Sequence, residues 1–112
     1  MAGTKITQLS PETLRIARQY RRALDNAGIR VENFLVFGSQ AKGTAQKSSD
    51  IDIAVVSSQF SRDYSSERVR LMRLGDKISL AIEPHPFHPD DLNDRWSTFA
   101  QEIKKYGIQV GE

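Results

Sequence analysis

The sequence contains no cysteine among its 112 residues. This absence excludes disulfide bridges, cysteine nucleophiles and thiolate metal sites, and it fits a reducing compartment. No apolar run approaches the roughly 20 residues that a membrane-spanning helix needs, and the N-terminal segment has no secretory apolar core. We therefore expect a cytoplasmic protein that does not associate with membranes.

The sequence also lacks a strong excess of one charge, because 16 basic and 14 acidic side chains give a formal net charge of +2. The sequence pI near 9.1 thus reflects a small excess of bases and no concentrated basic patch. The arginines between residues 15 and 22 fall on a predicted helix with an apolar stripe, which favours a solvated face. Direct binding to nucleic acid is not expected.

Histidine is scarce as well, with only His85 and His88. Their spacing fits no helical metal motif, so we do not expect them to bind a transition metal. The run from His88 through Pro89 to Asp91 instead predicts a helix start, with proline in the first turn and acids near its positive end. His85 remains a candidate for the rim of a site.

Hydrophobic content of 38% with 27% charged residues predicts a globular protein. The length predicts a single domain over 1–112, in which residues 1–6 are expected to be disordered. The order of helical and strand patterns along the chain predicts an α/β fold. We expect a small mixed sheet of three or four strands flanked by about four helices. Trp96 lies on an apolar stripe of the last helix, which favours packing in a core or an interface. The predicted helices cover 11–27, a short stretch after residue 39, 67–77 and about 92–106. The predicted strands cover 31–37, 50–56, 78–83 and 108–110. Residues 57–66 form a polar loop that could move on substrate binding.

Two carboxylates stand out at the start of the second predicted strand, where the sequence runs Asp50-Ile51-Asp52-Ile53. Side chains alternate faces along a strand, so Asp50 and Asp52 share one face with attachment points roughly 6.5–7 Å apart. Carboxylates at that spacing can converge on Mg²⁺, which prefers oxygen ligands and keeps water and substrate phosphates in its shell. A solvated pair of acids on an edge strand is the competing interpretation.

A glycine turn precedes these acids, since Gly38 ends the apolar run 34–37 and Ser39 opens a short predicted helix. Glycine lets backbone amides approach a ligand closely, and free amides at a helix start favour a phosphate. Ser39 adds a hydroxyl donor and Lys42 adds positive charge. The spacing matches neither the P-loop nor the dinucleotide-binding fingerprint.

Glu83 is the candidate third carboxylate, at the end of the strand predicted over 78–83. Ser79 and Ala81 would share its face and leave room for a ligand. Glu83 is therefore a candidate metal ligand or a general base for an attacking hydroxyl. A glutamate exposed to solvent at a strand end is the alternative.

The pattern Gly38-Ser39-x-x-x-Gly43 followed by Ser49-Asp50-Ile51-Asp52 resembles the signature of the DNA-polymerase-beta-type nucleotidyltransferases, and within them the minimal nucleotidyltransferases (MNT). The resemblance implies the nucleotidyltransferase fold, ATP as the nucleotide and Mg²⁺ as the cofactor. It implies that the Gly38 to Gly43 turn, with Lys42 and Ser49, binds the nucleotide. Asp50 and Asp52 would be catalytic metal ligands, and a third carboxylate on a later strand, for which Glu83 is the candidate, would complete the site. Gln40 departs from the family, which often has arginine there.

The resemblance further implies transfer of AMP to a hydroxyl of a partner protein, as the antitoxin-like member of a pair with a HEPN-type helical partner. Larger relatives carry an extra domain for the acceptor, for which this sequence has no room. Two other hypotheses stay open. The chain could neutralise a partner by contact without catalysis, or it could be an orphan nucleotide-binding domain that acts as a homo-oligomer.

Overall fold

The structure is a computed structural model that describes residues 9–46 and 49–111, and the disorder expected for residues 1–6 lies outside this part. Its centre is a four-stranded sheet in the order β3-β2-β1-β4. β2 runs parallel to β3, whereas β1 is antiparallel to both of its neighbours. The predicted mixed α/β architecture is thus confirmed, with the strands β1 Asn33–Phe37, β2 Ile51–Val56, β3 Ile82–Phe87 and β4 Ile108–Gln109.

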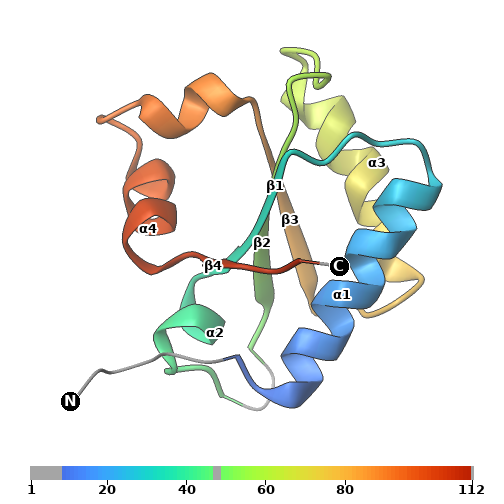
Figure 1. Ribbon diagram of the computed structural model, residues 1–112, viewed down its shortest axis with the longest axis vertical. Coiled ribbons are helices and arrows are strands. Elements are labelled where there is room, and N and C mark those ends of the chain that lie inside the picture. The colour runs from blue at the N-terminus through green and yellow to red at the C-terminus, as the bar shows by residue number, and fades with distance from the viewer. Residues whose placement is uncertain (1–8, 47–48, 112) are drawn as a thin grey trace.

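Helices cover both faces of the sheet. Figure 1 shows α1 and α3 on one face and α4 with the 3₁₀ helix η1 on the other. Within the described residues, no helix is both long and apolar enough to cross a bilayer. The bounds are α1 Pro11–Asn26, α2 Ser39–Lys42, α3 Tyr64–Asp76, η1 Pro89–Asn93 and α4 Thr98–Tyr106.

α1 follows its sequence signals closely. The Ser10 side chain caps the helix by accepting the Thr13 amide at 3.1 Å, and Pro11 occupies the first turn. Gly28 lies just beyond the end at a φ of 81°. The buried face of α1 packs on the sheet with Leu71 of α3, and this core contains Ile16, Ala17, Tyr20, Leu24, Phe34, Val36, Ile53, Val55 and Leu71.

β3 corrects the predicted strand over 78–83, because it begins at Ile82 and ends at Phe87. Leu80, which was expected on the strand, is 82% exposed in the preceding turn. β3 contains Pro84 and Pro86, which made this segment resemble a loop. It lies at the edge of the sheet and pairs on one side only, where prolines without an amide hydrogen are tolerated.

The segment around the last helix also differs from its prediction. η1 and α4 are separate helices, and Ser97 caps α4 by accepting the Ala100 amide at 3.1 Å. Trp96 precedes that cap, so helical spacing does not apply to it. Its side chain is 86% exposed, and the expected packing in a core is wrong. Contact of Trp96 with a partner stays a prediction.

Candidate functional site

The glycine turn follows β1 and touches the next strand. Gly38 has a φ of 73°, and a Cβ atom there would lie 2.5 Å from Oδ2 of Asp52. Only glycine fits this position, because both the backbone conformation and the close approach exclude a side chain. α2 begins at the next residue, and Gly43 ends it in the left-handed conformation. The first amides of a helix have no partner within it, so this turn presents donors beside a carboxylate.

Two of the predicted carboxylates are neighbours across the sheet. Asp52 on β2 pairs in register with Glu83 on β3, and on its other side with Phe37 of β1. Paired residues of adjacent strands lie on the same face about 5 Å apart. The Asp52 and Glu83 side chains are each 32% exposed, so they are accessible to a ligand. Asp50, the first residue of the predicted strand, is exposed and lies one position before β2 begins.

His85 is the site residue whose role the sequence did not reveal. Its Nε2 lies 3.1 Å from Oδ1 of Asp52, and its ring lies between those of Phe37 and Phe99, with centroids 5.2 and 5.1 Å away. Glu83 and His85 are two residues apart on β3 and therefore share a face. Placing the strand over residues 82–87 would have put His85 on the same face as Glu83, but the two prolines concealed the strand.

Arg68 of α3 brings a positive charge to the edge of the site. Its Nη2 lies 3.6 Å from Oε1 of Glu83, in a pair whose two side chains are 44% and 32% exposed. Asp52 thus contacts His85, and Glu83 contacts Arg68. Such pairing relieves the repulsion between neighbouring carboxylates that a divalent cation would otherwise relieve.

The predicted Mg²⁺ ligands carry the oxygen donors that this ion prefers, and two of the three are neighbours in the structure. Mg²⁺ binds carboxylate oxygens, and Asp52 and Glu83 lie side by side beside the Gly38 turn. Among residues 9–46 and 49–111, no three His, Cys, Asp or Glu side chains are gathered closely enough to hold a metal ion. The three predicted ligands therefore have suitable oxygen chemistry but are not gathered into a metal site, and their binding of Mg²⁺, with the exposed Asp50 as the third ligand, stays a prediction.

Other predicted nucleotide-binding residues lie around the turn, with two of them engaged elsewhere. Nζ of Lys42 lies 3.1 Å from Oε1 of Glu102 on α4 and 5.1 Å from the Tyr106 ring centre. The Ser49 hydroxyl accepts the Gln46 amide at 2.7 Å. These contacts direct Lys42 toward α4 and link Ser49 to Gln46.

Gln40 has a structural function in this turn. Its Oε1 accepts the Thr13 hydroxyl of α1 at 3.0 Å, and its Nε2 lies 3.4 Å from the carbonyl oxygens of Ser49 and Asp50. The side chain connects α1, α2 and the segment before β2. A longer, charged arginine would not reproduce this set of neutral contacts.

A groove of about 250 Å³ borders the carboxylates on the β3 side of the sheet. We call it the β3 groove. His85 connects it to Asp52, and Arg68 connects it to Glu83. Its walls come from the start of α3, the end of β3 and the start of α4, and consist of Tyr64, Ser65, Arg68, His85, Pro86, Phe87 and Phe99.

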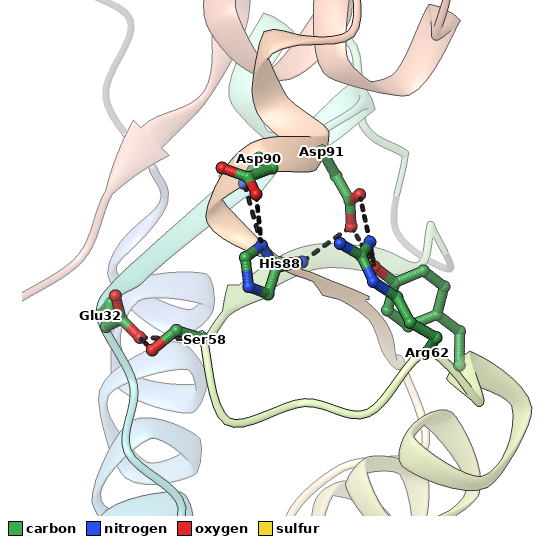
Figure 2. A network of polar contacts seen from close by, with 7 residues as sticks. Glu32, Ser58, Arg62, His88, Asp90 and Asp91 are labelled. Carbon is green, nitrogen blue, oxygen red and sulfur yellow. Dashed lines mark hydrogen bonds and ion pairs between the residues drawn. The ribbon is translucent and has the colours of Figure 1, made fainter.

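The polar segment before α3 makes side-chain contacts at both ends, and its movement on substrate binding stays a prediction. Glu32 accepts bonds from the amide and hydroxyl of Ser58 at one end, and Arg62 lies 3.5 Å from Asp91 of η1 at the other. Figure 2 shows both contacts and the cap that His88 makes on η1. The bonds from Ser58 lower the pKa of Glu32, so its carboxylate stays charged to a lower pH than an ordinary glutamate does.

A family model of the nucleotidyltransferase domain matches residues 14–106. No curated protein matches the sequence significantly. The crystal structure of a toxin–antitoxin with AMP-PNP contains a chain that is 21% identical in sequence to this one and similar in structure, with a TM-score of 0.62. The match covers 85% of this chain and 72% of that one.

Two further solved structures share the fold. A candidate nucleotidyltransferase from Sulfolobus solfataricus has 18% identity and a TM-score of 0.62, over 97% of this chain and 89% of that one. A complex of the tri-AMPylated HEPN toxin of Shewanella oneidensis with its MNT antitoxin gives 16% identity and a TM-score of 0.58, over 88% of this chain and 71% of that one. These likenesses confirm the predicted fold.

Proposed function

This chain belongs to the nucleotidyltransferase domain family, and from that premise we propose that it transfers AMP from ATP to a hydroxyl group of a partner protein. The single observation that carries the proposal is the contact of the Gly38 turn with Asp52, beside Glu83 on the next strand. A donor-rich turn and neighbouring carboxylates supply what a nucleoside triphosphate and its counter-ion require. In this proposal, residues 1–112 act as a single minimal nucleotidyltransferase domain.

The chain's residues divide the work of binding and positioning. The amides of the Gly38 turn and the Ser39 hydroxyl would bind the triphosphate. Asp50, Asp52 and Glu83 would hold Mg²⁺, which when bound neutralises phosphate charge and orients the reacting oxygens. His85 holds one oxygen of Asp52 and so fixes the orientation of that carboxylate. Most of the rate enhancement would come from positioning and charge neutralisation.

The reaction is an in-line displacement at the α-phosphorus. The acceptor oxygen forms a bond to phosphorus while the bond from phosphorus to the bridging oxygen breaks, and pyrophosphate leaves. The proton of the acceptor hydroxyl passes to a nearby carboxylate and then to water. Glu83 is the candidate for this task, as an alternative to its role as a metal ligand, because it lies on β3 beside Asp52.

A HEPN-type helical protein is the proposed partner. Two proteins with this fold were crystallised as toxin–antitoxin assemblies, one with AMP-PNP and one with an AMPylated HEPN toxin. AMP-PNP is an ATP analogue, which supports ATP as the nucleotide. The competing function is neutralisation by contact alone. It is favoured by the pairing of Asp52 with His85 and of Glu83 with Arg68, which occupies both carboxylates.

The test uses ATP labelled on the α-phosphate, Mg²⁺ and the protein encoded beside this chain. Asp50→Asn should abolish label transfer while the melting temperature stays unchanged, because Asp50 is exposed. Asp25→Asn is the matched control, an exposed acid on α1. Full activity of Asp50→Asn would refute the mechanism. A tight complex without any label would favour neutralisation by contact.

A further inference from the structure

We propose that the β3 groove receives the acceptor segment of the partner polypeptide. This inference rests on the proposed nucleotidyl transfer and adds the direction from which the acceptor reaches the site. It assigns Phe99, Arg68 and Ser65 to acceptor recognition.

The sheet order fixes the side of approach. In a phosphoryl or nucleotidyl transfer, the attacking and leaving oxygens lie roughly in line on opposite sides of phosphorus. The Gly38 turn, which would hold the leaving pyrophosphate, lies at the end of β1. Asp52 lies on the central strand β2, and β3 is on the far side of it from β1. The attacking oxygen must therefore come from over β3, where the groove lies.

The groove meets the reacting region at two contacts. His85 is a wall of the groove, and its Nε2 lies 3.1 Å from Asp52. Arg68 is another wall, and its Nη2 lies 3.6 Å from Glu83. Asp52 and Glu83 do not line the groove themselves, so a side chain inserted along it would approach them past His85 and Arg68, on the side away from the Gly38 turn.

The chemistry of the groove suits a polypeptide more than a nucleic acid. Phe87, Phe99 and Pro86 give it an apolar wall, and Tyr64 and Ser65 give it a polar one. Phe99 is 49% exposed, and exposed aromatic side chains are enriched at protein interfaces. A second exposed aromatic residue, Trp96, precedes α4 close by in sequence.

The charges around the groove are balanced. Arg62 and Arg68 lie near Asp91 and Glu83 respectively, so positive and negative groups alternate. A phosphate backbone requires a run of positive charge, which this balance does not provide. A polypeptide segment with mixed polar and apolar side chains does not require it.

The polar wall of the groove is preorganised. The Tyr64 hydroxyl donates to Asp91 of η1, and Arg62 also contacts Asp91. Asp63 caps α3 by accepting the Ser66 amide at 3.2 Å, which fixes the turn that carries Ser65. A preformed groove lowers the ordering cost of binding.

The absence of cysteine allows a direct test, because one introduced cysteine becomes the only thiol in the chain. Ser65→Cys places it in the groove, and Gln19→Cys places it on the exposed surface of α1 as the matched control. A bulky maleimide is attached to each purified variant. Label transfer from α-labelled ATP to the protein encoded beside this chain is then compared with that of the same variant before modification.

The adduct at position 65 should lower transfer by about tenfold or more, because it prevents correct placement of the acceptor. ATP affinity, measured by equilibrium dialysis, should stay unchanged, and the adduct at position 19 should change neither quantity. Unchanged transfer with the position 65 adduct would overturn the proposal. An equal loss of ATP affinity would also overturn it, because the groove would then hold the nucleotide.

Partner protection separates this inference from the proposed function. Addition of the partner should slow the maleimide reaction at position 65 by about tenfold or more relative to position 19, if the partner covers the groove. Protection without any label transfer would support the groove as the docking site and refute the chemistry. Transfer by the wild-type chain without protection would support the chemistry and refute the groove. Protection by an added oligonucleotide in place of the partner would identify a nucleic-acid site and refute the proposal.

Discussion

The two faces of the sheet are built from the same strands and differ in almost every physical property. The face toward α1 and α3 carries Phe34, Val36, Ile53 and Val55, all at most 1% exposed. The face toward α4 carries Phe37, Asp52, Glu83 and His85, where apolar packing gives way to accessible charge. Alternate residues of each strand thus serve stability on one side and chemistry on the other.

This division shows where the protein can tolerate polar groups. The closed face is covered by α1 and α3, whereas the open face carries the shorter helices α4 and η1 (Figure 1) and leaves Asp52 and Glu83, near the β3 edge, each 32% exposed. Carboxylates at that edge retain access to water and to ligands, so they need not lose their charge. Each of the following changes tests whether the two faces are as separate as they appear.

A pair of phenylalanines gives the largest expected contrast in stability. Phe34→Ala on the closed face should lower the free energy of unfolding by about 3–5 kcal/mol, because it opens a cavity in the core. Phe99→Ala on the open face should lower it by about 1 kcal/mol, since half of that ring is already exposed. Urea denaturation measures both values. Equal losses would show that the open face is also a packed core.

Asp52→Asn, on the open face, should have a large effect on activity and a small effect on stability. Loss of a charged ligand should lower the rate of nucleotidyl transfer by about a hundredfold or more, which corresponds to about 3 kcal/mol. The free energy of unfolding should change by less than about 1 kcal/mol, because the side chain is partly exposed and, among the described residues, its one hydrogen bond is to His85. A label-transfer assay and urea denaturation test the two parts separately.

Two glycines that both have positive φ angles differ in what a side chain would meet. Gly38→Ala should lower the free energy of unfolding by about 1–3 kcal/mol more than Gly28→Ala. Both residues have positive φ angles, but only an alanine at position 38 would collide with Asp52. Similar losses for the two variants would mean that the turn yields easily to the new methyl group.

Tyr20 gives a smaller effect that depends on pH. Burial, and then the charge of Asp76, raise the pKa of the Tyr20 hydroxyl well above its usual range, and this hydroxyl donates to the Leu71 carbonyl at 2.8 Å. Its ionisation in the unfolded chain should therefore favour unfolding. Below pH about 10 the contribution is constant, and above it stability should fall by up to about 1.4 kcal/mol per pH unit.

Tyr20→Phe is the control for this effect. The variant should lose about 1 kcal/mol at neutral pH, because the hydrogen bond to Leu71 is removed. Its stability should fall less steeply than that of the wild type between pH 10 and 11.5, measured by urea denaturation at each pH. Parallel curves for the two proteins would show that Tyr20 ionises equally easily in the folded and unfolded chains.

Local patterns were sufficient for the elements that carry their own signals. α1 has a serine cap, a first-turn proline and a terminal glycine, and it begins and ends where these residues predict. β2 has alternating isoleucines and begins one residue after its predicted start. β3 was displaced because its prolines contradict strand propensity, and only its edge position makes them tolerable.

The sequence by itself determined the family, the sheet and the residue types of the site, because Gly38, Ser39, Asp50 and Asp52 lie close together along the chain. Tertiary structure alone decided what lies around them. His85 reaches Asp52 because parallel pairing of β2 with β3 joins segments about thirty residues apart, whereas Arg68 reaches Glu83 because α3 packs against β3. Side-chain spacing along one strand follows from backbone geometry, whereas spacing between strands depends on packing of the whole fold.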